Sequence, residues 1–140
     1  MSYIGSFEHS VDGKGRVVVP SQFRDDFRDG GHLQMRRDHI ALYDPAAWQA
    51  HMEKLRVLVA SGELKRPQFN QLLALSADVS PDAQGRFGLP SQLRQMAEIG
   101  YRVQFVGADD YLAIYSIANQ PVPEPEIFDQ LMDVYDGLPL

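Results

Sequence analysis

Short runs in which apolar and polar residues alternate predict a chain built mainly of strands. The first run covers residues 3–11, and the Asp-Gly pair that follows it is a strong signal for a tight turn. A β-branched run at 16–19 returns from that turn, and Pro20 ends it because proline cannot donate a ladder hydrogen bond. Alternation at 32–36 and 39–43 predicts a second hairpin.

Two segments in the first half carry apolar residues at helical spacing. Ser21 is suited to cap a short helix in which Phe23 and Phe27 share one face. Asp44 is suited to cap the longest helix, with proline at its first position, and Gly62 ends it. The inward positions of this helix are Trp48, Met52, Leu55 and Val59.

The second half repeats the same order of elements. A strand is predicted at 77–80, its return strand at 87–89, a short helix capped by Ser91, and a hairpin over 101–115. One further helix, predicted at 68–75, comes directly before the pattern restarts. Its inward positions are Phe69, Leu72 and Leu73.

This repetition is visible in the residues themselves. The segment 12–24, DGKGRVVVPSQFR, returns at 82–94 as DAQGRFGLPSQLR, and seven of the 13 positions are identical without a gap. The identical pairs are Asp12/Asp82, Gly15/Gly85, Arg16/Arg86, Pro20/Pro90, Ser21/Ser91, Gln22/Gln92 and Arg24/Arg94. Modules of about 70 residues can only just bury a core alone, so we expect the two copies to share one.

The chain therefore divides into four parts. We expect a first module at 1–55, connecting helices at 56–76, a second module at 77–120 and an acidic tail at 121–140. The tail opens with a stiff proline-rich linker and continues as a weakly amphipathic helix. This helix either packs on a neighbour or is only partly ordered.

Composition excludes several classes of protein. The chain has no cysteine, which excludes disulfides, thiolate nucleophiles and zinc–thiolate sites. Its N-terminus lacks the basic and apolar regions of a signal peptide, and no apolar run approaches the length of a membrane span, so we expect a cytoplasmic protein. The four histidines lack metal-ligand spacing, and no catalytic or nucleotide-binding motif is present. We therefore expect no enzyme activity, no metal and no cofactor.

Charge is distributed unevenly along the chain. The net charge is −6, yet the first 70 residues carry ten Lys/Arg against nine Asp/Glu, whereas the last 70 carry three against ten. Such asymmetry is a hint of a nucleic-acid-binding face opposed by an acidic segment. An acidic surface that serves only solubility explains it equally well.

The repeated turn carries the candidate chemistry. Asp12 and Arg16 are four residues apart across a glycine turn, where a carboxylate and a guanidinium can form a bidentate ion pair. That pair either orients the loop for binding a ligand or only stabilises the conformation of the loop. Lys14 lies in the same loop with little apolar material to bury it, and loops on a rigid β scaffold often carry binding residues. Arg24 and Arg94 could extend a basic strip or be solvated, and we expect Arg94 to be solvated.

These motifs resemble those of the MraZ family of bacterial transcriptional regulators, whose chain holds two modules of the SpoVT/AbrB swapped-hairpin type. The resemblance covers nearly all of residues 1–120. It is carried by SFEHSVDGKGRVVVPSQFR, by LYDPAAWQ and by DAQGRFGLPSQLR. The chain departs from the family pattern at Gly13, where a bulkier residue is common, and at Pro81.

The resemblance implies an α+β, mainly β fold: a tandem swapped-hairpin AbrB-like β-barrel, a pseudo-dimer in one chain, with peripheral helices. It also implies a ring-like homo-oligomer, an octamer or dodecamer. Such a ring would bind tandem repeats of double-stranded DNA in the promoter of its own division and cell-wall operon. Localisation would be cytoplasmic and nucleoid-associated, with no membrane or small-molecule partner.

The family's DNA-contacting loops carry over residue by residue. Lys14 and Arg16 in the first copy and Arg86 in the second are the DNA-binding candidates, with Arg24 beside them. Asp12 and Asp82 are the loop-orienting acids.

One alternative remains from a different class. AbrB-type folds also serve as antitoxins or scaffolds that bind another protein, and the acidic tail with its spaced apolar residues suits such a role.

Overall fold

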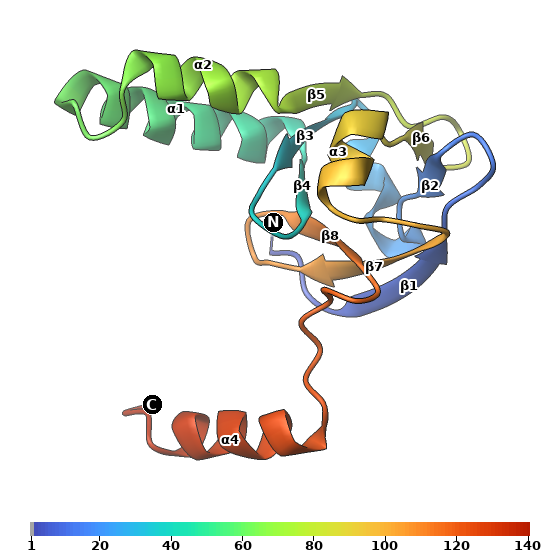
Figure 1. Cartoon of the computed structure of the whole chain (residues 1–140), viewed down its shortest axis with the longest axis vertical. Helices are drawn as coiled ribbons and strands as arrows, with labels where there is room; N and C mark the ends of the chain where they lie inside the picture. Colours follow the sequence, from blue (N-terminus) through green and yellow to red (C-terminus); the bar gives the residue numbers. More distant parts are fainter. Residues whose placement is uncertain (1) are drawn as a thin grey trace.

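The computed structural model describes residues 2–140 and consists of an antiparallel sheet, a small two-stranded ribbon and helices at the periphery (Figure 1). The strands are β1 (Ser6–Ser10), β2 (Arg16–Val18), β3 (Gly31–Met35), β4 (Ile40–Tyr43), β5 (Ser76–Val79), β6 (Arg86–Gly88), β7 (Arg102–Gly107) and β8 (Leu112–Ser116). The helices are the 3-10 helix η1 (Ser21–Phe27), α1 (Pro45–Ser61), α2 (Arg66–Ala74), α3 (Ser91–Met96) and α4 (Pro125–Asp136). The predicted mixture of helices and strands is confirmed, although the described helices hold more residues than the strands, so the fold is not mainly β.

The two copies exchange strands. In the six-stranded sheet, with order β1-β7-β8-β4-β3-β5, the first strand of each copy pairs with the hairpin of the other. The two hairpins meet at the centre, where Ile40 of β4 lies opposite Ile114 of β8. In the separate ribbon, β2 of the first copy pairs with β6 of the second, and Val17 lies opposite Phe87.

The prediction of a closed barrel is wrong for the part of the chain that the structure describes. Strands β1 and β5 are the two edges of the six-stranded sheet and do not pair with each other. The strands that could bridge them, β2 and β6, are three residues long and pair only with one another. Pro20 and Pro90, two residues beyond these strands, lack the N–H that a longer ladder would need.

A single hydrophobic core joins the two copies. Its members come from the strands and short helices of both, as expected for modules too small to bury a core alone. The largest side chains that are fully buried are Tyr3, Phe27, Leu33, Ile40, Leu42, Phe105, Leu112 and Ile114.

The helices begin and end largely where the sequence predicts. Asp44 caps α1 by accepting a hydrogen bond from the Ala47 N–H at 2.8 Å, and Gly62 ends α1 with a φ of 84°. The predicted serine caps are wrong, because η1 and α3 begin after Pro20 and Pro90 without a side-chain cap. In these short helices the fixed φ of proline starts the turn instead.

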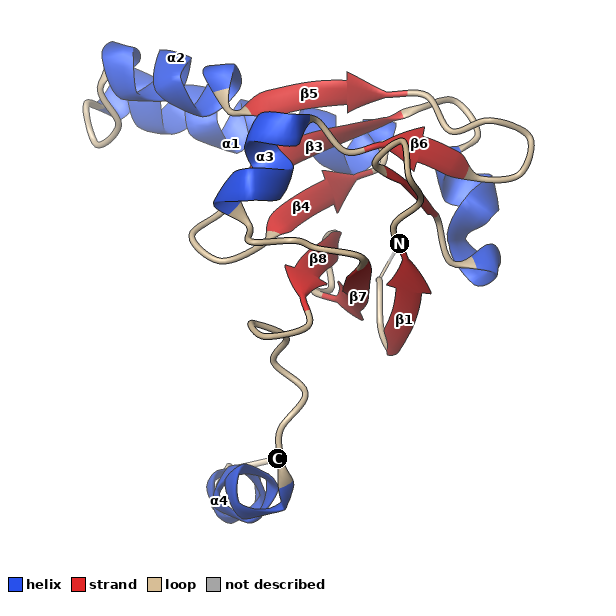
Figure 2. Ribbon diagram, turned by 45° about the vertical axis from the view of Figure 1, so that its right-hand side comes forward, coloured by secondary structure: helices blue, strands red, loops and turns tan. Residues whose placement is uncertain are grey.

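The long helices lie outside the sheet. Helices α1 and α2 form a hairpin that projects from one end of the molecule, as Figures 1 and 2 show. In α2, Phe69 is buried but Leu73 is exposed, contrary to the prediction, because only one side of the hairpin meets the sheet. Helix α4 lies away from the body at the end of an extended linker, and none of its residues is buried. None of the described helices is long and apolar enough to cross a membrane.

Candidate functional site

The first repeated turn is organised around the carboxylate of Asp12. Its Oδ1 accepts hydrogen bonds from the backbone N–H groups of Lys14 and Arg16, both at 2.9 Å. Its Oδ2 accepts from Nε of Arg16 at 2.7 Å. The turn closes with a bond from the Gly15 N–H to the Asp12 carbonyl, and Gly15 adopts a positive φ of 76°.

The second turn repeats this geometry around Asp82. Its Oδ1 accepts from the backbone N–H groups of Gln84 at 2.9 Å and Arg86 at 3.0 Å, and its Oδ2 accepts from Nε of Arg86 at 2.8 Å. Gly85 has a positive φ of 81°. The two loops are therefore built in the same way.

The carboxylates hold the loops in place and leave most of each guanidinium free. The backbone hydrogen bond from Arg16 is the largest cause that lowers the pKa of Asp12, and that from Arg86 does the same for Asp82. In each ion pair only Nε of the arginine contacts the carboxylate, through Oδ2. Oδ1 accepts hydrogen bonds from the backbone instead, so the bidentate pair expected from the sequence is not formed. Within residues 2–140, no hydrogen bond engages the terminal nitrogens of Arg16 or Arg86, and these can donate to a ligand.

The β2–β6 ribbon ties the two loops together. The Val19 N–H donates to the Gly85 carbonyl, and the Leu89 N–H donates to the Gly15 carbonyl, both at 2.9 Å. The loops lie beside each other at the end of the molecule opposite the α1–α2 hairpin (Figure 1). Lys14 is exposed, and Arg16 and Arg86 are half-buried.

An arginine from the opposite copy supports each loop. The Arg24 side chain lies against Gly85, where an added Cβ would come within 2.9 Å of its Nε, and this Nε donates to the Val19 carbonyl at 3.3 Å. The guanidinium of Arg94 lies against Gly15 in the same way. Arg24 is exposed and Arg94 is half-buried, so the expectation that Arg94 is solvated is wrong. The repeat pairs Arg94 with Arg24, but the half-buried place of Arg94 depends on its packing against the other copy's loop.

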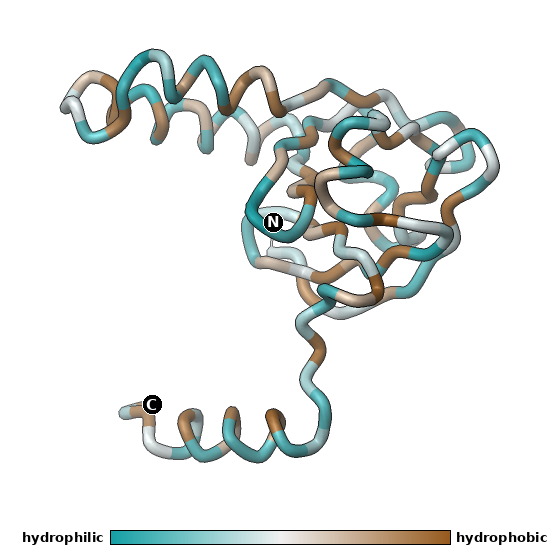
Figure 3. The backbone as a smooth tube through the Cα atoms, viewed as in Figure 1, coloured by the Kyte–Doolittle hydropathy of each residue, from teal (hydrophilic) through white to brown (hydrophobic). Residues whose placement is uncertain are grey.

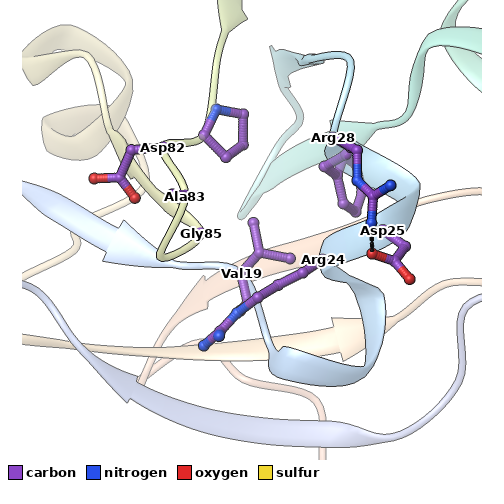
Figure 4. A pocket seen from close by; sticks show the side chains of 9 residues that line it. Val19, Arg24, Asp25, Arg28, Asp82, Ala83 and Gly85 are labelled. Carbon is purple, nitrogen blue, oxygen red and sulfur yellow. Dashed lines mark hydrogen bonds and ion pairs between the residues drawn. The ribbon is translucent and has the colours of Figure 1, made fainter.

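The two loops differ in their surroundings. Lys14 has the uncharged Gln84 as its equivalent. The Val11 N–H before the first loop donates to the Tyr101 carbonyl at 2.7 Å, whereas Pro81 before the second has no N–H to donate. A hollow of about 410 Å³ opens between the second loop and η1, and Figure 4 shows Arg28 on its η1 side and Arg24 extending from η1 towards Gly85. The first loop therefore carries more positive charge, and its entry is tied to the sheet by a hydrogen bond.

Sequence reasoning missed a second polar cluster beneath α1. Arg36 donates to Gln34 and to the Tyr43 hydroxyl, and His51 Nε2 lies 3.0 Å from Gln34 Oε1. Burial, followed by the nearby Arg36 charge, lowers the pKa of His51 to about 4, and burial raises the pKa of Tyr43 to about 12. These residues belong to no motif, and pairing between strands and α1 brings them together. His51 of α1 is therefore neutral near pH 7, and its hydrogen bond to Gln34 of β3 holds α1 on the sheet.

Among the described side chains, no group of three or more His, Asp or Glu could hold a metal ion.

Comparison with known proteins identifies relatives along most of the chain. The family model described as "MraZ protein, putative antitoxin-like" matches residues 3–63 and 72–119. A protein of Thermomicrobium roseum named "Transcriptional regulator MraZ" is 35% identical over 118 residues, which cover 84% of this chain and 83% of the relative. A protein of the same name from Lachnoclostridium phytofermentans is 33% identical over 132 residues, with 94% and 93% covered. Both modules thus have counterparts in these regulators.

Proposed function

The chain belongs to the MraZ family of transcriptional regulators, and from this premise we propose that it binds double-stranded promoter DNA through its two Asp-x-x-x-Arg loops. The target would be tandem repeats in the promoter of its own division and cell-wall operon. The observation that carries the proposal is the pair of matching loops, joined by one ribbon, in which Arg16 and Arg86 keep their terminal nitrogens free.

The chemistry of these loops suits a phosphate backbone. Arginine donates to phosphate through a planar fork, and lysine supplies a compact positive charge. Because Asp12 and Asp82 hold the Nε edge, each guanidinium presents its outer nitrogens in a fixed direction. Fixing a binding side chain before the ligand arrives lowers the entropy cost of binding.

We assign the roles in a definite order. Lys14 and Arg16 make the principal contacts, and Arg86 makes a weaker contact because its loop lacks a lysine and lies in the acidic half. Arg24 contributes to the same surface while supporting the second loop, and Arg94 supports the first loop. Asp12 and Asp82 are orienting residues.

Self-association is part of the proposal. Two or three phosphate contacts per chain would give weak binding at physiological salt. Several copies in a ring that faces repeated DNA sites would raise the apparent affinity through effective concentration. The exchange of strands between the two copies supports the view of a swapped-hairpin pseudo-dimer that forms one rigid subunit of such a ring. Its place of action would be the cytoplasm, at the nucleoid.

A second candidate function is an antitoxin or scaffold that binds another protein. The observation that favours it is the exposed helix α4, and the matched family is itself described as antitoxin-like. Capture of a protein partner without any shift of DNA would favour this reading.

The proposal is tested with the DNA upstream of the chain's own gene. Electrophoretic mobility shifts with this DNA and with a shuffled control, each at two salt concentrations, measure specificity and ionic contacts separately. We expect a stepwise shift of the upstream DNA at concentrations that leave the control unshifted, and weaker binding at the higher salt. Equal binding to both duplexes would contradict sequence-specific regulation.

A further inference from the structure

Helix α4 carries an apolar face that the rest of the described chain leaves exposed. Apolar residues recur along α4 at spacings of three and four, and Figure 3 shows them once per turn. They are Ile127, Phe128, Leu131, Val134 and Tyr135, and Leu138 follows just beyond the end of α4. Their exposed fractions range from 47% to 64%, so no other part of residues 2–140 covers this face.

A helix of this kind needs a partner to be stable. Helix α4 has 12 residues, and an isolated helix of about 12–15 residues is marginal in water. In proteins such helices are stabilised by packing of their apolar face. The well-formed α4 therefore implies a surface that covers this face.

The negative charge of the tail favours docking of α4 on a basic surface. The tail carries five acids and no basic residue, and within residues 2–140 none of these acids is in an ion pair. The acids are Glu124, Glu126, Asp129, Asp133 and Asp136. Those within α4 lie on the side away from the apolar face, so a docked α4 would place them about one helix diameter from its partner. This is close to the distance of roughly 8–10 Å over which charges act at physiological salt.

The α1–α2 hairpin has the complementary features. It carries four basic residues against two acidic ones, and none of these cations forms an ion pair with a described carboxylate. The cations are Lys54, Arg56, Lys65 and Arg66. Two apolar residues of the hairpin are exposed, Val57 by 66% and Leu73 by 40%. Figure 1 shows the hairpin at the top of the molecule and α4 at the bottom, so the two do not meet within one molecule.

We propose that α4 of one chain docks its apolar face on the α1–α2 hairpin of a second copy. The contact joins two different surfaces, and repetition of such a head-to-tail contact builds a ring where the rotation closes. The inference rests on the self-association in the proposed function, but it does not depend on DNA binding.

Cysteine crosslinking tests the contact, because the natural chain has no cysteine. Leu131→Cys combined with either Val57→Cys or Leu73→Cys should give a ladder of covalent multimers on a non-reducing gel. Leu131→Cys alone can give dimers at most. A matched pair, Leu131→Cys with Tyr101→Cys, tests whether α4 folds back on the groove of about 430 Å³ beside its own linker. A crosslinked monomer from that pair, or no ladder with both hairpin positions, would overturn the proposal.

Mass measurement by light scattering gives an independent readout. Leu131→Asp should reduce the assembly to the mass found for a chain that ends at residue 120, while circular dichroism shows a folded core. Gln130→Asp adds the same charge outside the apolar face and should leave the mass unchanged. An unchanged mass for Leu131→Asp would overturn the contact. Neither assay contains DNA, so a chain that crosslinks but fails to shift DNA contradicts only the proposed function.

Discussion

The guanidinium of Arg94 lies against the backbone of Gly15, although the two residues belong to different copies of the repeat. Arg24 and Gly85 form the reciprocal contact. Each loop is therefore shaped by its own aspartate and supported by the other copy's arginine. This arrangement makes the two loops one structural unit, and it explains why glycine is needed at both positions.

The first prediction concerns Gly15→Ala. Gly15 has a φ of +76°, where an L-residue costs roughly 1–2 kcal/mol, and an added methyl group would meet Arg94. We expect the free energy of unfolding to fall by about 1–2 kcal/mol in urea denaturation. Gly13→Ala is the matched control, because Gly13 has no positive φ and no atom within 4 Å of an added Cβ.

The collision with Arg94 can be separated from the backbone strain. Adding Arg94→Ala to Gly15→Ala removes the side chain that the new methyl group meets, so the double variant should lose less than the sum of the two single changes. Strict additivity, or an equal loss from Gly13→Ala, would mean that the contact between Arg94 and Gly15 has no energetic role.

The second prediction concerns pH. Hydrogen bonds from the backbone of Arg16 lower the pKa of Asp12 below its usual 3.8. A carboxyl with a depressed folded-state pKa stabilises its loop fully above the unfolded pKa, about 3.9, and this stabilisation is lost as pH falls through the folded pKa. The amide NMR shifts of Lys14 and Arg16 should therefore titrate together with a midpoint below 3.8.

Asp12→Asn is the control for that titration, because an amide cannot lose a proton in this range. The two amide shifts should then no longer respond to acid. A midpoint at or above 3.8 in the parent chain would contradict the described hydrogen bonds.

Much of this fold follows from local sequence features. Asp44 and Gly62 mark the ends of α1 because a cap and a positive φ are local requirements. The shape of each repeated loop follows for the same reason, since the hydrogen bonds to its aspartate carboxylate lie within five residues. The six residues assigned from sequence thus fall on two adjoining loops and one supporting helix, while their binding roles stay a prediction.

The rest depends on how the two copies meet, which local patterns do not specify. The half-buried place of Arg94 comes from packing against the other copy's loop. The open sheet comes from the pairing of β2 with β6 alone, and the Arg36 cluster comes from the docking of α1 on β3 and β4. Leu73 has the spacing of an inward residue, but the hairpin projects beyond the sheet that could cover it.

The third prediction tests the difference between the loops. Lys14 and Gln84 occupy equivalent positions with the same backbone geometry, so Gln84→Lys should place a second cation beside Arg86. We expect tighter DNA binding and a salt dependence that steepens by about one unit in the log–log slope for each additional phosphate that a chain neutralises. Lys14→Gln should produce the opposite change, as measured by fluorescence anisotropy over a range of salt concentrations. If both changes leave the slope unaltered, these two positions do not face phosphate.

The fourth prediction concerns Arg16 itself. Its terminal nitrogens are free to donate, so Arg16→Ala should weaken binding to upstream DNA by about 1–3 kcal/mol per contact, multiplied across the copies of an assembly. Arg37→Ala removes the same charge from an exposed turn between β3 and β4 and is the matched control.

Arg86→Ala should weaken DNA binding less than Arg16→Ala does, because the loop of Arg86 lies in the acidic half. Binding constants from anisotropy, with circular dichroism to confirm folding, decide the matter. If Arg16→Ala binds as tightly as the parent while remaining folded, DNA does not meet the protein at the first loop.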